Sequence, residues 1–445
     1  MRSCASAVLS AAFSLSLGVL LVQPLPVRAV TSYANDFVDP TYVLAKDFSN
    51  VTAEAQATIV SWAQSLAREG PWSDSWPNCS SVGNTTALTD EEVWTTCPYE
   101  TRDGQFNPDG RLVNDVGAFS DLADAVLYNA LAWAIKGSGT YSGNVATFVK
   151  AWFLDADTAM NPNLAYAQMA RGPDGQVGQH TGVLDLKCMA KLVSGVLILR
   201  EGQAAEWTSD IDTQFSAWAA NYTTWLTTAS IALEEEAAEN NHGTFYYNQL
   251  AALQVLVGDT AGAKATLEKY FTTQYMWQID ASGDQESLHK SQQAQTNPRP
   301  PTQTNAKIGA YIGYDAWNLT TSNGTTIKSA LDYALTQGAG TETASELYPD
   351  VVAVGAAYGD AGGKYAAWML ANAKKAYPED AQFFWNQPFS DSGLVKTGGS
   401  SSTGSSGSGN SVSGGADASS DNGAARGAWS AVAAMGAAVL VAAVL

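Results

Sequence analysis

The most chemically suggestive stretch of the sequence is AENNHGTFYYNQLAAL, from Ala238 to Leu253. Two asparagines, one imidazole and two phenols stand there at the start of an apolar helical pattern. Amides donate hydrogen bonds to anions, and an imidazole or a phenol can transfer protons as a general acid or base. The alternative interpretation is structural, with Asn240 capping a helix and His242 in the core with its hydrogen bonds satisfied.

Three polar stretches, residues 95–119, 154–185 and 344–360, are predicted to be loops that carry further functional side chains. The first contains Arg102 and Arg111. The second is dense in amides and also holds an aromatic, an arginine and a histidine: Asn161, Asn163, Tyr166, Gln168, Arg171 and His180. Such loops over a rigid scaffold suit carbohydrate recognition, although Asn-Pro and Pro-Asp-Gly are also ordinary turn formers.

The titratable residues do not form a metal motif in the sequence. The chain has only three histidines, His180, His242 and His289, and they are scattered without the Cys/His spacing of a zinc site. The acidic run from Glu234 to Glu236 is typical of a solvated helix face. We therefore expect no bound metal.

Helices must position these residues. Apolar side chains recur at helical spacing in segments such as FSDLADAVLYNALAWAIK, FYYNQLAALQVLVG and TTIKSALDYALTQ. Alternating β patterns are scarce, and no linker divides the block from residue 30 to residue 388. Many helices of moderate length in one block predict an all-α fold of antiparallel helix pairs in a ring or solenoid. The absence of a strict period disfavours a tandem-repeat array.

The two ends of the chain predict export and anchoring. Residues 1–29 have the charge pattern, apolar stretch and small-residue cleavage site of a secretory signal peptide. Residues 389–427 form a Gly/Ser-rich linker, and residues 428–445 an apolar tail, which together resemble a glycosylphosphatidylinositol signal. A tail-anchored helix is the competing interpretation. The candidate attachment residues are Ser419, Ser420 and Asn422.

Charge and cysteine content narrow the class further. A net charge of −20 argues against a nucleic-acid partner. Cys79 and Cys97 flank a loop-like stretch and are expected to form a disulfide in an oxidising compartment, whereas Cys188 lies in an apolar pattern typical of a buried thiol. Glycosylation sequons fit the same compartment and begin at Asn50, Asn78, Asn84, Asn221, Asn318 and Asn323.

Several motifs occur in a characteristic order. MNPNLAYAQ follows WFLDADT, and then come GVLD, NNHGTFY with AALQVLVGDTAGA, SALDYAL and ELYP. In order and spacing these motifs resemble the alginate lyase domain family, and CPYETRDGQFNPDG resembles its fungal secreted branch. The resemblance implies an incomplete (α/α) toroid, β-elimination of uronic-acid polymers of the alginate or glucuronan type, and no cofactor. We expect a monomer.

The resemblance also implies roles for individual residues. Asn241 would donate to the substrate carboxylate, and His242 would be the neighbouring base or stabiliser. Further substrate contacts would come from residues 95–119 and 154–185, namely Arg102, Asn163, Tyr166, Gln168 and Arg171. Tyr247 and Tyr314 are candidate phenols for acid or base chemistry by residue type alone, because neither stands where the family pattern places its tyrosine.

One segment departs from the family pattern. After IDASGDQ the family carries an Arg-x-Arg and then a His-Tyr on a helix, whereas residues 286–306 here are rich in Gln, Pro and Thr. Either the chain has diverged, or the coding sequence is misread locally by a splice or reading-frame error. The segment therefore keeps open two other functions on the same scaffold, a carbohydrate-binding cell-wall protein without catalysis and a glycoside hydrolase.

Overall fold

The computed structural model describes residues 35–48, 50–73, 115–168, 178–285, 302–337, 344–373 and 379–387. Every regular element in these ranges is a helix and none is a strand, which confirms the all-α prediction. Closure of the helices into a toroid stays a prediction. No helix within the described ranges combines the length and hydropathy needed to cross a membrane. The signal peptide, linker and tail predicted from the sequence lie outside these ranges.

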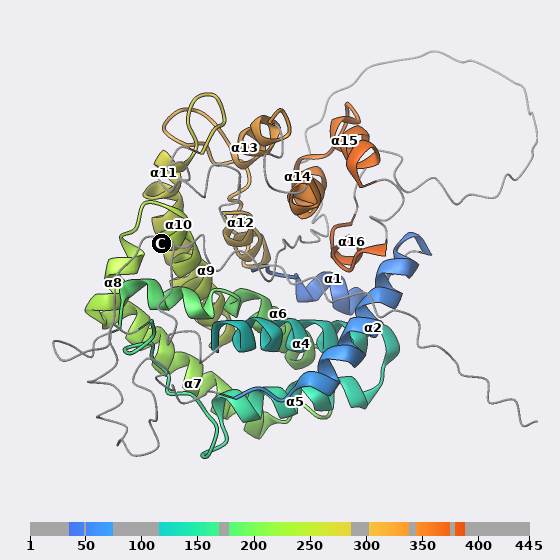
Figure 1. Cartoon of the computed structure of the whole chain (residues 1–445), viewed down its shortest axis with the longest axis vertical. Helices are drawn as coiled ribbons and strands as arrows, with labels where there is room; N and C mark the ends of the chain where they lie inside the picture. The colour runs from blue at the N-terminus through green and yellow to red at the C-terminus, as the bar shows by residue number, and fades with distance from the viewer. Residues whose placement is uncertain are drawn as a thin grey trace, which may run out of the picture. The chain divides into compact units, whose positions relative to one another are not determined.

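Figure 1 labels the elements. Within the described residues the α-helices and 3₁₀ helices (η) are, in chain order, α1 (Pro40–Ala45), η1 (Asn50–Thr52), α2 (Ala53–Glu69), α4 (Asp115–Lys136), α5 (Gly139–Phe153), η5 (His180–Leu186), α6 (Met189–Glu201), α7 (Ser209–Thr228), α8 (Ser230–Glu236), α9 (Asn241–Leu256), α10 (Thr260–Thr272), α11 (Tyr275–Gln278), α12 (Thr302–Tyr311), α13 (Ile327–Ala334), η7 (Ala344–Leu347), α14 (Tyr348–Tyr358), α15 (Lys364–Asn372) and α16 (Gln382–Trp385).

Two helices organise the core. Helix α4 packs against α2, α5 and α6, and helix α9 packs against α6, α7, α8, α10 and α12 (Figure 1). Every residue of α9 from His242 to Leu256 is buried. A helix buried on all faces is a core element rather than a surface one. The residues at the start of α9 are therefore held by neighbours on every side.

Two predicted irregular stretches are helical instead. The prediction of a loop over residues 344–360 is wrong, because residues 344–358 form η7 and α14. Pro349 lies in the first turn of α14, where a missing N–H costs nothing, and the apolar run that follows is buried. Residues 302–306 were expected to replace a helix, but they form the first half of α12, where Thr302, Thr304 and Asn305 are buried.

The cysteine predictions have different outcomes. Cys188 is buried, with its sulfur 3.8 Å from Ser120 Oγ, and it forms no disulfide within the described ranges. This position confirms the prediction of a buried thiol. The predicted pair Cys79 and Cys97 lies outside the described residues.

Candidate active site

The start of α9 divides the two asparagines between two tasks. Asn240 is the N-cap residue, and its side-chain oxygen accepts a hydrogen bond of 3.0 Å from the backbone N–H of His242. Asn240 therefore has the capping role that the alternative, structural interpretation gave it. Asn241, the first helical residue, is partly exposed, and its side chain makes no hydrogen bond to another described residue. Its amide remains available at the positive end of the helix dipole.

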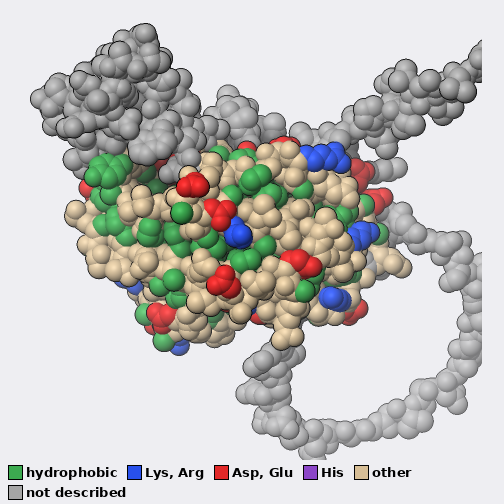
Figure 2. Space-filling model, turned by 90° about the horizontal axis from the view of Figure 1, so that it is seen from below, with side chains coloured by type: hydrophobic (Ala, Val, Ile, Leu, Met, Phe, Trp, Pro, Cys, Tyr) green, Lys and Arg blue, Asp and Glu red, His purple; other side chains and the backbone are tan. Residues whose placement is uncertain are grey.

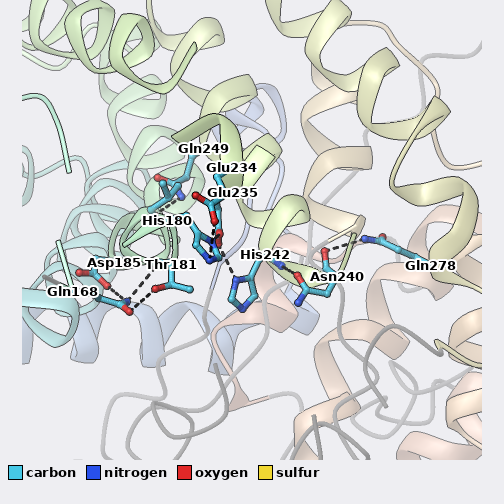
Figure 3. A network of polar contacts seen from close by, with 11 residues as sticks. Gln168, His180, Thr181, Asp185, Glu234, Glu235, Asn240, His242, Gln249 and Gln278 are labelled. Atoms are coloured by element: carbon cyan, nitrogen blue, oxygen red, sulfur yellow. Dashed lines mark hydrogen bonds and ion pairs between the residues drawn. The ribbon is translucent and has the colours of Figure 1, made fainter. Parts of the chain in front are cut away.

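His242 lies beside a buried carboxylate. Its Nδ1 is 3.0 Å from Glu235 Oε1, and the Nδ1 of His180 is 2.5 Å from Glu235 Oε2 (Figure 3). The three residues come from three elements, His180 from η5, Glu235 from α8 and His242 from α9. We call them the His–Glu–His cluster. Folding thus brings together two histidines that are 62 positions apart in the sequence.

Glu235 corrects the prediction that the acidic run faces solvent. Its side chain has no exposed area, whereas Glu234 beside it is 66% exposed and fits the prediction. The physical reason is helical spacing, because Glu235 follows the fully buried Ala232 by three residues and shares its inward face. The solvent-exposed carboxylate of Glu234 lies 3.7 Å from His180 Nε2.

Within the His–Glu–His cluster, the carboxylate and the imidazoles stabilise each other's charged forms. Burial alone would raise the pKa of Glu235, but hydrogen bonds from His180 and His242 hold that pKa below its ordinary value. The hydrogen bond to Glu235 in turn raises the pKa of His180, against the opposing effect of its partial burial. The carboxylate is therefore charged at neutral pH, and His180 keeps its proton to a higher pH than an ordinary histidine.

The donor set of the cluster resembles a metal site in composition. One atom from each of the three residues lies within 4.8 Å of the other two. Zinc bonds of about 2.0–2.2 Å in tetrahedral geometry would hold ligand atoms about 3.3 Å apart, whereas the two carboxylate contacts are 2.5 and 3.0 Å long. These are hydrogen-bond distances. The arrangement fits shared protons better than a shared cation.

Gln168 fixes the neighbouring loop to the 3₁₀ helix η5. Its amide nitrogen donates to Asp185 Oδ1 at 2.7 Å and to the carbonyl of Thr181 at 3.2 Å, and its oxygen accepts from the Thr181 hydroxyl at 2.9 Å (Figure 3). Its φ of 47° is in the left-handed region that non-glycine residues rarely adopt. In this structure the predicted substrate-binding amide is used to hold the loop beside His180.

The other predicted binding residues have different environments. Asn163 accepts a hydrogen bond of 3.2 Å from the backbone N–H of Ala165, which is an Asx turn. Tyr166 is 65% exposed, so its ring is free to contact a ligand. Arg102 and Arg171 lie outside the described residues.

The two candidate phenols differ in accessibility. Tyr247 is 1% exposed and packs against Tyr270, with ring centroids 5.5 Å apart. Tyr314 is partly exposed beside Phe271 of α10. Burial raises the pKa of both hydroxyls. Of the two, only Tyr314 is open to solvent in this structure.

Gln278 of α11 holds the turn between α8 and α9. Its amide nitrogen contacts the carbonyl of Asn240 at 3.2 Å and the hydroxyl of Thr244 at 3.0 Å, and its oxygen accepts from Tyr270 at 2.9 Å. On the other side of α9, Gln249 donates to the carbonyl of Val183 in η5 at 2.9 Å. Two buried glutamines therefore fix α9, one against α10 and α11 and the other against η5, which carries His180.

Sequence reasoning missed the roles of Glu235, Gln249 and Gln278, and it named His180 only as one residue of a predicted loop. Only Glu235 carried a usable signal, its helical spacing from Ala232 on a short helix. The other three depend on contacts between elements distant in the sequence. No local pattern encodes those contacts.

The described fold is shared with a solved enzyme. The crystal structure of an alginate lyase from Bacteroides ovatus matches with a TM-score of 0.66 and 20% sequence identity, over 80% of this chain and 100% of that one. At this identity the match shows the fold alone. A search of curated protein sequences finds no match.

The family follows from the sequence match. The model of the alginate lyase family matches residues 63–344, more than half of the chain, and this range includes the whole His–Glu–His cluster. The chain belongs to the alginate lyase family.

Proposed function

We propose that this chain is a polysaccharide lyase that cleaves uronic-acid polymers of the alginate or glucuronan type by β-elimination. The observation that carries the proposal is the pairing of an available amide, Asn241, with an oriented imidazole, His242, in the first turn of α9. The positive end of a helix dipole favours a bound carboxylate. Family membership supports the same reaction class.

The reaction requires removal of the proton on C5 of the uronate, next to its carboxylate. Asn241 donates to that carboxylate and stabilises the enolate-like charge that develops on it. His242 takes the C5 proton or stabilises the resulting anion. The C5–H electron pair forms the C4=C5 double bond, the C4–O bond breaks, and the leaving oxygen takes a proton from an acid such as Tyr314.

The acidic surface makes local recognition necessary. The chain carries a net charge of −20 and the substrate is a polyanion, so long-range electrostatics oppose binding. We propose that uncharged donors and aromatic faces supply the affinity, with Asn241 and the exposed ring of Tyr166 among them. Binding should therefore tighten as salt screens the repulsion.

The test is the absorbance of the unsaturated uronate product when the full chain is incubated with alginate or polyglucuronate. His242→Ala and Asn241→Ala should each lower turnover by a factor of about 10² to 10⁴. The matched control is Asn372→Ala, which removes an exposed amide at the end of α15. Reducing ends released without that absorbance would indicate a hydrolase and contradict the proposal.

A carbohydrate-binding protein without catalysis is the second candidate. It is favoured by residues 286–306, whose sequence departs from the family pattern where the Arg and Tyr are expected. A wild-type chain that binds uronans without cleaving them, and loses affinity on Asn241→Ala, would establish this function instead.

We also propose that the protein is secreted, of the fungal type, glycosylated and tethered to the cell surface by a lipid anchor. The sequon asparagines in the described ranges, Asn50, Asn221, Asn318 and Asn323, are all exposed. Attachment of a glycan requires such exposure, so their positions support passage through the secretory pathway.

A further inference from the structure

The two oxygens of Glu235 serve two different imidazoles. Oε1 faces the Nδ1 of His242, and Oε2 faces the Nδ1 of His180. A charged carboxylate only accepts hydrogen bonds, so the Nδ1 of His180, at 2.5 Å, carries a proton. At the Nδ1 of His242, at 3.0 Å, a proton is favoured because a lone pair there would face the negative charge. A neutral imidazole protonated on Nδ1 keeps its lone pair on Nε2. The contact with Glu235 therefore selects one of two tautomers in His242.

The carboxylate is held by a rigid setting. Helix α8 packs against η5, α7 and α9, and the carbonyl of Glu236 at its end accepts a 2.7 Å hydrogen bond from Gln274. Gly243 of α9 approaches the carbonyl of Ala238 so closely that no side chain fits between them. The turn that separates Glu235 from His242 therefore has little freedom to change their distance.

We infer that Glu235 is a positioning residue, which holds His242 with its proton on Nδ1 and its Nε2 lone pair available to the substrate. The inference rests on the proposed lyase function for its catalytic consequence, but not for its geometry. When Nε2 accepts the C5 proton, the imidazolium gains a buried negative partner at 3.0 Å. The proton leaves Nε2 for solvent or for the departing oxygen, and Glu235 stays ionised throughout.

His180 acts on the same carboxylate from the solvent side. It is 36% exposed, and its hydrogen bond to Oε2 gives the Glu235 carboxylate a second partner besides His242. The charged groups nearest to it are Glu235 and Glu234, while Glu236 is paired with Lys269 at 2.7 Å. We assign His180 the role of fixing the rotamer of Glu235, which makes it a second positioning residue.

The tautomer can be measured directly, because the chain has only three histidines. NMR of the full chain, with histidine labelled in its ring nitrogens and at alkaline pH, should show His242 and His180 protonated on Nδ1. In Glu235→Gln, His242 should change to a mixture of tautomers. His242 protonated on Nε2 in the wild type would overturn the inference, whether or not the protein is a lyase.

Enzyme kinetics distinguish a positioning role of Glu235 from a purely structural one. Glu235→Gln should lower kcat on the uronan by a factor on the order of 10² with KM little changed, since a wrongly oriented base affects the chemical step. Glu234→Gln, on the same helix but solvent-exposed, is the matched control and should change kcat less than twofold. An equal loss in both variants would contradict the inference.

Substitution of His180 covers the case in which Glu235→Gln fails to fold. An asparagine amide can occupy the place of Nδ1–H, so His180→Asn should retain the Nδ1–H tautomer of His242 and most of the activity, whereas His180→Ala should lose both. Equal behaviour of the two variants would refute the role of His180. Titration of the wild type with zinc chloride completes the test: submicromolar binding that disappears in Glu235→Gln would replace the positioning role with a metal site.

Discussion

At the residue scale, Asn240 and Asn241 show how identical side chains acquire different roles from one position of offset. The backbone of Asn240 is extended, with φ −88° and ψ −162°, which turns its side chain back onto the N–H of His242. Asn241 is already the first residue of the helix, and its side chain makes no hydrogen bond to another described residue. Only the first amide is consumed by folding, and the second remains available for a ligand.

The cap gives a stability prediction. Asn240→Ala should lower the free energy of unfolding by about 1 kcal/mol, because one N–H of the first turn loses its acceptor. Asn240→Asp should retain the stability, since a carboxylate caps equally well and suits the helix dipole. Chemical denaturation measures both values. Asn372→Ala, at an exposed helix end, is the control, and an equal loss there would contradict the capping argument.

At the element scale, the sequence predicted helices well where one periodic pattern dominates. The apolar pattern after Asn240 predicts α9, and SALDYAL predicts the amphipathic α13. Prediction from the apolar pattern fails where apolar and turn-forming residues mix. In α14, the Tyr-Pro at the start of the helix predicts a loop instead. In α12 the buried threonines and asparagine look like a solvated segment, because burial there depends on α9 and α10.

The candidate site was predictable only in part for the same reason. Asn241 and His242 follow from a local motif, and so does the cap at Asn240. The Glu235 carboxylate and the His180 imidazole reach His242 only because η5 and α8 pack together against α9. Three histidines scattered in the sequence give no sign of that contact. Element packing, rather than residue type, creates the cluster.

Gly243 tests how tightly the α8–α9 turn is built. A Cβ at this position would collide with the carbonyl oxygen of Ala238, which is backbone and cannot rotate away. Gly243→Ala should therefore lower the free energy of unfolding by about 1–3 kcal/mol, the usual range for overpacking. Displacing the turn should also lengthen the contact between Glu235 and His242 and reduce activity.

The matched control is Gly143→Ala within α5. There the nearest atom to an added Cβ is Glu206 Cγ at 3.8 Å, which is ordinary contact. Alanine favours a helix interior over glycine, so this variant should be neutral or slightly stabilising. Thermal and denaturant unfolding of both variants give the comparison. A harmless Gly243→Ala would show that the turn can relax.

At the scale of the whole molecule, the predicted lipid anchor gives a cellular test. Residues 389–427 are polar and rich in Gly and Ser, and residues 428–445 are apolar to the last position. If this tail is exchanged for a lipid, phosphatidylinositol-specific phospholipase should release the protein from cells. Retention after treatment, with residues 428–445 detected in the mature chain by mass spectrometry, would favour a tail-anchored helix.

The start of the described chain is tied to its end through buried polar contacts. Asp36 has no exposed area, forms an ion pair with Lys307 of α12, and accepts a 3.0 Å hydrogen bond from Trp385 of α16. Next to it, the backbone N–H of Val38 donates to Ser194 Oγ of α6 at 2.9 Å. Three helices that are remote in sequence therefore converge on residues 35–38.

Removing Lys307 from its ion pair with Asp36 should strongly lower the free energy of unfolding. Lys307→Met leaves the Asp36 carboxylate buried without its cationic partner, and such a change typically lowers the free energy of unfolding by about 3–5 kcal/mol. Lys364→Met is the control, because in its ion pair with Asp332 the lysine is 49% and the carboxylate 31% exposed, and a solvated pair of this kind contributes about 0–1 kcal/mol. Adding Asp36→Asn to Lys307→Met should recover most of the loss.

The stability lost in Lys307→Met should also depend on pH. Burial raises the pKa of Asp36 to about 6, even with Lys307 present. A carboxyl whose pKa is raised by folding contributes stability below its unfolded pKa of 3.8, and this contribution is lost as pH rises through the folded value. Without Lys307 the folded pKa should rise further, so the deficit of Lys307→Met should be smaller at acidic than at alkaline pH. Denaturant unfolding of the variant and the wild type across this pH range measures how the difference in their free energies of unfolding changes with pH. A difference that is constant with pH would mean that lost packing of the lysine stem, rather than the buried charge, causes the destabilisation.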